Sequence, residues 1–294
     1  MINTCLFPVA GYGTRFLPAT KAVPKEMLPV LDKPLVQYGV EEAVDAGFSQ
    51  MGFVTGRGKR AIEDHFDRSP EVENQIEGTS KADLLAGVSK LIDTCSFSFT
   101  RQVEMGGLGD AILKGRPLVG NEPFAVVLPD DLCFCEEAGV LQQMVALHEH
   151  FGCSIVAIEE VPEDQIHNYG VISGEPIDAP GEDMAGRLFR VNGMVEKPQS
   201  DPPSNLAIIG RYILTPDIFG IIENTEPGAN GELQITDALR TQAEQGSVIG
   251  YRFKGRRFDC GSVPGFVEAT NYCFEQRFGK AYGPTTSVEG HTGA

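Results

Sequence analysis

Short apolar runs and amphipathic segments alternate along the first half of the chain. Residues 4–10 and 124–128 are apolar runs of the kind that form strands buried on both faces. Residues 35–46 repeat valine at every fourth position, which predicts an amphipathic helix. Further strands are expected at 52–55, 96–100 and 154–158, and further helices at 61–66, 109–118 and 140–150. This alternation predicts an α/β fold, a mainly parallel sheet with helices on both faces.

The second half is less regular. Strands are expected at 169–173, 188–195 and 206–214, and helices at 215–222, 236–244 and 264–278. Two polar stretches stand apart from this pattern. Residues 67–93 are expected to form a surface excursion, and residues 279–294 a flexible tail.

Composition and charge narrow the classes of function. The 294 residues are 41% hydrophobic and 22% charged, which is typical of a globular protein, and the net charge is −17. Such a charge disfavours a nucleic-acid or membrane-surface partner, and we find no membrane-spanning run or signal peptide. The expected location is therefore the cytoplasm. Residues 1–60 nevertheless carry a local charge of +2, which suits a small polyanion bound in one cleft.

Cysteine and histidine give no sign of a metal centre or a nucleophile. The seven cysteines stand at 5, 95, 133, 135, 153, 260 and 273, an odd number without a Cys-x-x-Cys pair. We expect buried free thiols and no zinc site. Surface positions are expected for His65, His148, His150, His167 and His291, because none falls in a recognisable motif.

A glycine loop follows the first predicted strand. Gly11 and Gly13 suit close approach of backbone N–H groups to phosphate oxygens. Phe16 replaces the third glycine of a dinucleotide-binding fingerprint, and Pro18 blocks the expected helix, so an NAD site is disfavoured. A P-loop and a hydrolase nucleophile elbow are also missing from the sequence. A tight turn without a ligand remains the alternative at this point.

The residues after the loop favour a phosphate ligand. Prolines 18, 24 and 29 fix an extended path that can hold cations toward a cleft. Arg15 offers a planar fork for phosphate, and Lys25 a compact ammonium charge. Together they could neutralise a triphosphate and its leaving pyrophosphate.

Two motifs in this segment resemble those of the bacterial UTP–glucose-1-phosphate uridylyltransferases, within the sugar-nucleotidyltransferases. They are Ala10-Gly11-x-Gly13-Thr14-Arg15 with Pro18-Ala19-Thr20-Lys21, and Pro24-Lys25-Glu26-Met27-Leu28-Pro29. The resemblance extends to about residue 278. It implies a Rossmann-like mixed sheet with sugar-binding additions. Residues 1–278 would form one nucleotidyltransferase domain, with a nucleotide-binding part over about 1–135 and a sugar-binding and C-terminal part over about 136–278.

The resemblance also implies roles for particular residues. Uracil recognition would fall to Ala10, Gly11, Gln102 and Gly107, and other substrate contacts to Gly13, Thr14 and Glu26. The sugar and its phosphate would meet Gly170, Glu196, Lys197 and Gly210. Mg²⁺ would bind Asp130 and, less securely, Asp259, while Asp131 has no assigned role. Arg15, Lys25 and Lys197 would be the catalytic cations.

The implied reaction converts UTP and α-D-glucose 1-phosphate into UDP-glucose and pyrophosphate, in a homodimer or homotetramer. Three alternatives remain open at this stage. One is a nucleotidyltransferase for dTTP or another sugar 1-phosphate, and another is a catalytically silent relative that binds sugar nucleotides. The third is an NAD dehydrogenase.

Overall fold

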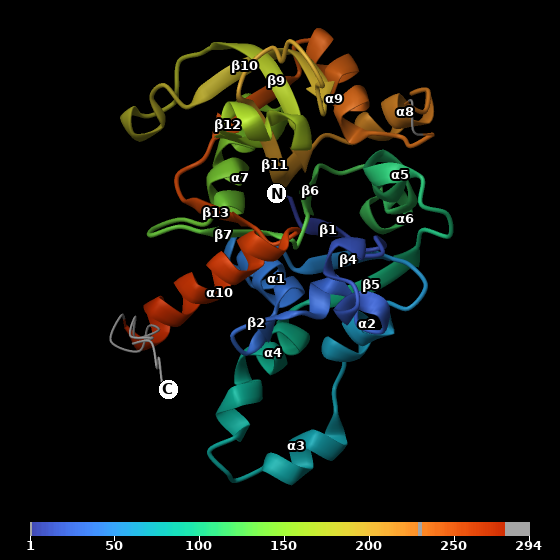
Figure 1. Cartoon of the computed structure of the whole chain (residues 1–294), viewed down its shortest axis with the longest axis vertical. Coiled ribbons are helices and arrows are strands. Elements are labelled where there is room, and N and C mark those ends of the chain that lie inside the picture. Colours follow the sequence, from blue (N-terminus) through green and yellow to red (C-terminus); the bar gives the residue numbers. More distant parts are fainter. Residues whose placement is uncertain (1, 229–230, 280–294) are drawn as a thin grey trace, which may run out of the picture.

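A nine-stranded mixed sheet forms the centre of the molecule in the computed structural model, which describes residues 2–228 and 231–279 (Figure 1). Its strands are β1 (Thr4–Pro8), β4 (Gln50–Thr55), β5 (Ser96–Arg101), β6 (Phe124–Val127), β8 (Ser154–Glu160), β9 (Gly170–Pro176), β10 (Leu188–Glu196), β11 (Leu206–Leu214) and β12 (Val248–Arg252). Their order across the sheet is β5-β4-β1-β6-β11-β8-β12-β10-β9. The tail predicted at 279–294 lies outside the described residues, apart from residue 279.

Strand direction changes within the sheet. β5, β4, β1 and β6 run parallel to one another, whereas β11 is antiparallel to both of its neighbours, β6 and β8. β8 and β12 are parallel, and β10 is antiparallel to β12 and β9. Seven of these nine strands therefore point the same way, as the predicted mainly parallel sheet requires.

Helices cover both faces of the sheet. The described α-helices are α1 (Leu35–Asp45), α2 (Arg60–His65), α3 (Pro70–Ile76), α4 (Ala82–Thr94), α5 (Gly107–Lys114), α6 (Arg116–Val119), α7 (Val140–Phe151), α8 (Ile218–Glu223), α9 (Ile235–Glu244) and α10 (Val263–Phe278). Helices α1, α2, α4 and α7 pack in the core of one face, and α5, α6, α8 and α9 in the core of the other. No described helix is long and apolar enough to cross a membrane.

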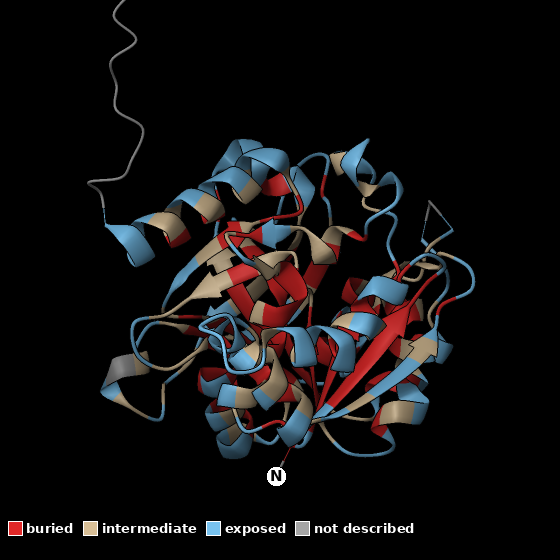
Figure 2. Cartoon of the chain, turned by 90° about the horizontal axis from the view of Figure 1, so that it is seen from below, coloured by how far each residue is buried: buried red, intermediate tan, exposed pale blue. Residues whose placement is uncertain are grey.

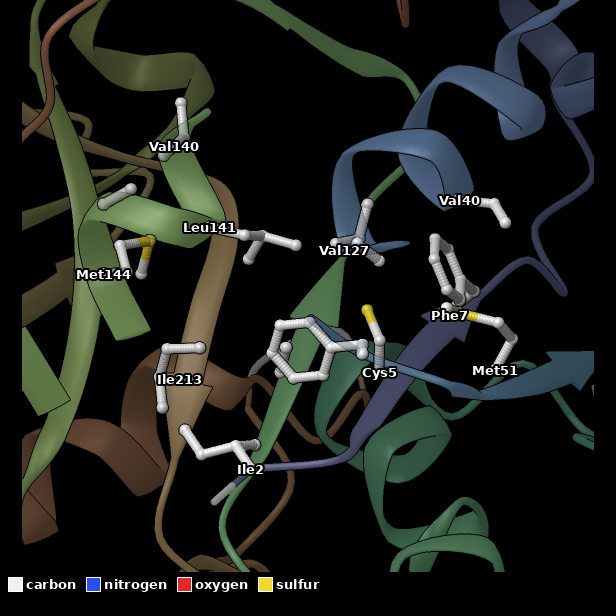
Figure 3. Packing of buried hydrophobic residues seen from close by; sticks show 14 of the residues in the cluster. Ile2, Cys5, Phe7, Val40, Met51, Val127, Val140, Leu141, Met144 and Ile213 are labelled. Carbon is white, nitrogen blue, oxygen red and sulfur yellow. The ribbon is translucent and has the colours of Figure 1, made fainter. Parts of the chain in front are cut away.

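The alternation of side chains along β1 shows how the two cores arise. Cys5 and Phe7 point into one core, where Phe7 stacks on Phe53 with ring centroids 4.9 Å apart, and Leu6 points into the other. Figure 3 shows the first core, with Leu141 of α7 facing the strands. Figure 2 shows buried residues in the strands and on the inner parts of the helices, with exposed residues around the outside. Burial on both faces explains why these strands appear as continuous apolar runs.

Two short ribbons and the last helix extend the core. The ribbons pair β2 (Pro29–Val30) with β3 (Lys33–Pro34), and β7 (Asp131–Phe134) with β13 (Arg256–Asp259). Helix α10 packs on β2 and β13, where Phe258, Ala269 and Cys273 are buried with Val30. The C-terminal helix thereby returns to the segment that follows the glycine loop.

Most elements lie where the pattern predicts them, with four differences. The helix expected at 109–118 is divided at Gly115, where an added Cβ would lie 2.5 Å from Leu6. The helix expected at 215–222 begins only at Ile218. The excursion at 67–93 holds α3 and α4, and the strands β2, β3, β7, β12 and β13 were not predicted.

The predictions for cysteine and histidine are confirmed in part. All seven cysteines are free; Cys5, Cys260 and Cys273 are buried and the other four half-buried. The surface prediction is wrong for His148, which is 9% exposed because it lies on the buried face of α7 with Met144 and Leu147, where its Nδ1 is 2.8 Å from the Cys153 carbonyl oxygen. His65 is half-buried, His150 and His167 are exposed, and His291 lies outside the described residues.

Candidate active site

A cleft of about 560 Å³ opens between the segments after β1 and β6 on one side and β9, β10 and α9 on the other. Seven of the predicted site residues line it, namely Arg15, Asp130, Gly170, Glu196, Lys197, Gly210 and Asp259. They come from six separate segments of the chain. The fold therefore brings the predicted phosphate, metal and sugar residues to one place.

The glycine loop leaves β1 and runs into three short 3₁₀ turns, η1 (Thr14–Phe16), η2 (Ala19–Lys21) and η3 (Lys25–Met27). Gly13 has a φ of +65°, which glycine adopts readily, and its carbonyl oxygen accepts from Thr20 Oγ1 at 2.7 Å. A Cβ on Gly13 would lie 3.0 Å from the Cβ of Lys25. This close approach brings the glycine loop against the start of η3. Ala10 is buried beside the loop, whereas Gly11 and Thr14 are exposed.

Lys25 and Asp130 form an ion pair at the cleft. Lys25 Nζ lies 2.5 Å from Asp130 Oδ2, and both side chains are about one-quarter exposed. Burial opposes both charges, but their attraction outweighs it. The pKa of Lys25 is therefore raised and that of Asp130 is lowered. Both groups are consequently charged at neutral pH.

Glu26 lies beside Lys25 in the chain but does not line the cleft. Its side chain is 1% exposed and accepts from Lys59 Nζ at 2.7 Å, with Lys59 itself 6% exposed. Burial raises the pKa of Glu26 and lowers the pKa of Lys59. The sequence indicated Glu26 as a substrate contact and gave no signal for Lys59, which is 33 residues away.

Gln102 and Gly107 lie together at the C-terminal end of β5 and the start of α5. Gln102 Nε2 donates to the Gly107 carbonyl oxygen at 3.1 Å and to Asp110 Oδ2 at 2.7 Å. Gly107 has a φ of +92°, and an added Cβ would lie 2.7 Å from the Leu233 carbonyl oxygen. A side chain at this position would push apart two loops from opposite sides of the cleft.

Glu196, Lys197 and Gly170 form the far wall. Glu196 accepts from Thr236 Oγ1 at 2.7 Å, and Lys197 Nζ lies 3.2 Å from Glu196 Oε1. Lys197 has a φ of +44°, and its backbone N–H donates to the Tyr169 carbonyl oxygen at 3.0 Å. The Lys197 side chain is about half exposed, so its ammonium can reach a ligand in the cleft.

The floor of the cleft holds a charge network that the sequence did not reveal. Arg257 Nε donates to Asp131 Oδ1 at 2.5 Å, and Asp131 Oδ2 accepts from the Gly210 N–H at 2.7 Å. Tyr169 donates its hydroxyl to Asp259 at 3.3 Å, and its ring lies under the Arg257 guanidinium. Asp131 thus joins the loop after β6 to the wall formed by β11. The doubled aspartate was visible in the sequence, but nothing there indicated Arg257 as its partner.

Asp130 and Asp259 are the carboxylates best placed for a divalent cation. A Cβ on Gly261 would lie 3.0 Å from Asp259 Oδ1, 3.1 Å from Asp130 Oδ2 and 3.4 Å from Arg15 Nη1, so the two carboxylates approach one point together with a guanidinium. The described residues contain no cluster of three or more histidine, cysteine or acidic side chains suited to a metal. A two-carboxylate site suits a cation that takes its remaining ligands from water or phosphate.

The chain is similar to known nucleotidyl transferases. A family model for nucleotidyl transferases matches residues 9–276. A UTP–glucose-1-phosphate uridylyltransferase of Pseudomonas aeruginosa is 63% identical over 286 residues, 96% of this chain and 100% of that protein. A protein of the same name from Bacillus subtilis is 46% identical over 270 residues, 92% of this chain and 90% of that protein.

Solved structures give the same result. A UDP-glucose pyrophosphorylase complexed with UDP-glucose has a TM-score of 0.86 at 54% identity, over 94% of this chain and 100% of that chain. A UTP-bound UGPase from Acinetobacter baumannii has a TM-score of 0.83 at 37% identity, over 94% of each chain. The chain belongs to the nucleotidyl transferase family and, within it, to the group of the UTP–glucose-1-phosphate uridylyltransferases.

Proposed function

We propose that the chain transfers the uridylyl group of UTP to α-D-glucose 1-phosphate, giving UDP-glucose and pyrophosphate. One observation carries this proposal: Arg15, Lys197 and the carboxylate of Asp130 line a single cleft, and Lys25 reaches that cleft by pairing with Asp130. Relatives with this activity in their names match nearly the whole chain. The proposed partners are small molecules, with neither a nucleic acid nor a membrane among them.

Segments beside the cleft, which do not themselves line it, would supply both donors and acceptors for a uracil ring. The Gln102 amide can accept from the ring N3–H, and backbone groups at Ala10, Gly11 and Gly107 can bond the ring carbonyls. Gly13 and Thr14 continue from this site toward the phosphates. Glu26 is proposed to act on the substrate only indirectly, through its neighbour Lys25, because its own carboxylate is buried against Lys59.

The sugar half presents an acceptor and a cation side by side. Glu196 can accept from glucose hydroxyls, and Lys197 can bind the sugar phosphate and the α-phosphate. Gly170 and Gly210 allow the walls of the cleft to pack closely: a Cβ on Gly170 would lie 3.0 Å from Glu196 Oε2. A Cβ on Gly210 would lie 2.6 Å from Leu128.

In the proposed reaction, an oxygen of the sugar phosphate attacks the α-phosphorus of UTP in line. A new P–O bond forms while the bond between the α-phosphorus and the bridging oxygen breaks, and pyrophosphate leaves with that electron pair. The second pKa of a phosphate monoester is about 6, so the attacking group is already ionised and requires no general base. The protein therefore acts by positioning two mutually repelling anions and balancing their charge.

Different cations would bind different phosphates of the substrates. Arg15 and Lys25 would hold the β- and γ-phosphates, and Lys197 the two phosphates that react. Asp130 and Asp259 would hold Mg²⁺, which when bound neutralises phosphate charge as a Lewis acid. The convergence of the two carboxylates supports this ligand set.

Pyrophosphate release tests the proposal. With UTP, glucose 1-phosphate and Mg²⁺, we expect one pyrophosphate per UDP-glucose, and we expect no reaction in chelator. A panel of nucleotides and hexose phosphates tests the alternatives: a methyl-sized difference is worth about 1–3 kcal/mol, so dTTP should react more slowly, but measurably. UDP-glucose binding without turnover would instead favour a silent regulatory relative. The same preparation gives the oligomeric state, for which we propose a homodimer or homotetramer in the cytoplasm.

A further inference from the structure

Lys59 and Glu26 form a buried ion pair directly behind the proposed phosphate-binding lysine. Lys59 lies at the end of the loop that joins β4 to α2, and Glu26 lies in the middle of η3. Their side chains are 6% and 1% exposed, and the Nζ–Oε2 distance is 2.7 Å. Removing one partner of such a pair leaves an uncompensated buried charge, which is strongly unfavourable.

The geometry of η3 separates the two neighbouring side chains. A 3₁₀ turn has three residues per turn, so consecutive side chains point about 120° apart. Lys25 therefore faces Asp130 and the cleft, while Glu26 faces the interior and Lys59. Charges alternate along this path, from Lys59 to Glu26, Lys25 and Asp130.

If Lys59 is lost, Lys25 is the remaining lysine that interacts with Glu26. Besides its attraction to Lys59, the Glu26 carboxylate already interacts electrostatically with Lys25. A buried carboxylate without its partner would draw the Lys25 ammonium inward, away from Asp130 and from a bound phosphate. The pair thus has an effect on the cleft that packing alone would not have.

We propose that Lys59 is a positioning residue for the transfer reaction: it satisfies the charge of Glu26 and so leaves Lys25 directed into the cleft. Neither Lys59 nor Glu26 touches the reacting atoms in this arrangement. The inference rests on the proposed function, because it takes Lys25 to act on the phosphates of UTP.

The test compares Lys59→Met with the double variant Lys59→Met/Glu26→Gln. A displacement of about 1 Å at a positioned group can cost about 100-fold in rate, so Lys59→Met should lower kcat by about 10- to 100-fold. The double variant removes the competing carboxylate and should return kcat to within about fivefold of the wild type. Arg60→Gln is the matched control, because this neighbouring cation is 86% exposed and pairs only loosely with Asp64 at 3.4 Å.

Measuring the kcat of Lys59→Met in a Lys25→Ala background separates a positioning role from a purely structural one. In that background, Lys59→Met should cost less than about twofold further in kcat, because Lys59 acts through Lys25. An equal loss in both backgrounds would overturn the inference, as would unchanged kcat in the single variant.

If Lys59→Met does not fold, the double variant tests the proposed role of the Lys59–Glu26 pair. A folded double variant that has lost about 100-fold or more in kcat would mean that Glu26 contacts the substrate itself. Failure of the wild-type protein to release pyrophosphate would instead reject the proposed function, so the two failures are distinguishable.

Discussion

The ammonium of Lys25 lies 2.5 Å from the carboxylate of Asp130, so a proposed phosphate ligand neutralises a proposed metal ligand. Both groups are charged, because each shifts the pKa of the other in the direction that favours the ionised form. Binding of UTP would give Lys25 a phosphate partner and release Asp130 for a cation. The ion pair therefore links metal binding to nucleotide binding.

Metal binding without nucleotide should be weak for this reason. In Lys25→Ala the competing ammonium is gone, and we expect Mn²⁺ to bind about tenfold or more tightly in the absence of UTP. Electron paramagnetic resonance titration with Mn²⁺ measures this directly. Lys21→Ala, a substitution of an exposed lysine in the same segment, is the control and should leave the affinity unchanged. Equal Mn²⁺ affinity in all three proteins would argue against competition by Lys25.

Turnover should depend on Lys25 and Asp130 far more than folding does. We expect Lys25→Ala and Asp130→Asn each to lower kcat by about 10²- to 10³-fold, the usual cost of one charge-stabilising group. Their ion pair is about three-quarters buried, so removing one partner should lower the free energy of unfolding by about 1–3 kcal/mol, which leaves the protein folded under assay conditions. Steady-state kinetics and thermal melts together provide the measurement, with Lys81→Ala as a surface control. Parallel loss of activity and folded protein would count against these roles.

Gly210 should matter for the sugar more than for the nucleotide. A Cβ there would lie 2.6 Å from Leu128 and 2.7 Å from Asp131 Oδ2, so Gly210→Ala must shift one wall of the cleft. Overpacking of this kind costs about 1–3 kcal/mol, and we expect it chiefly as a raised KM for glucose 1-phosphate. Gly220→Ala is the control, because nothing lies within 4 Å of its added Cβ. A larger rise in the KM for UTP would be inconsistent with the proposed sugar wall.

His65 should make stability depend on pH. Burial lowers the pKa of His65, outweighing the opposing effect of Glu41, and Nε2 bonds Gln37 Oε1 at 3.0 Å. The unfolded chain therefore binds the proton more readily, so stability is lost as the pH falls below about 6.5, by at most about 1.4 kcal/mol per pH unit. Urea unfolding of His65→Gln between pH 7 and 5 should show a smaller loss than the wild type. The exposed His150→Gln should behave as the wild type does, and an unchanged slope in His65→Gln would disprove the assignment.

Periodicity could predict the parallel half of the sheet because its strands are buried on both faces. Leu6 and Phe7 are both fully buried, and β1 is apolar at every position after Thr4. Helices α3 and α4 gave no such signal, since Leu84 is 76% exposed and little of either helix faces a core. The strand β12 was missed because Gly250 interrupts its short apolar run.

Motifs could predict the residues of the cleft but not their partners. The glycine loop and the segment with Lys25 are continuous in sequence, so their resemblance to the motifs of a known family identifies them together. Lys59 lies 33 residues after its partner Glu26 in the sequence. Arg257 lies 126 residues after its partner Asp131. Ion pairs over such separations depend on the order of strands in the sheet, which a single sequence does not specify.

A crystal structure with UDP-glucose and Mg²⁺ bound tests most directly whether fixed cations and a metal bring the two phosphates together in this cleft. We expect the diphosphate between Arg15 and Lys197, the metal on Asp130, and Lys25 turned from Asp130 toward the position of the leaving pyrophosphate. A diphosphate bound away from these four side chains would contradict the proposed mechanism.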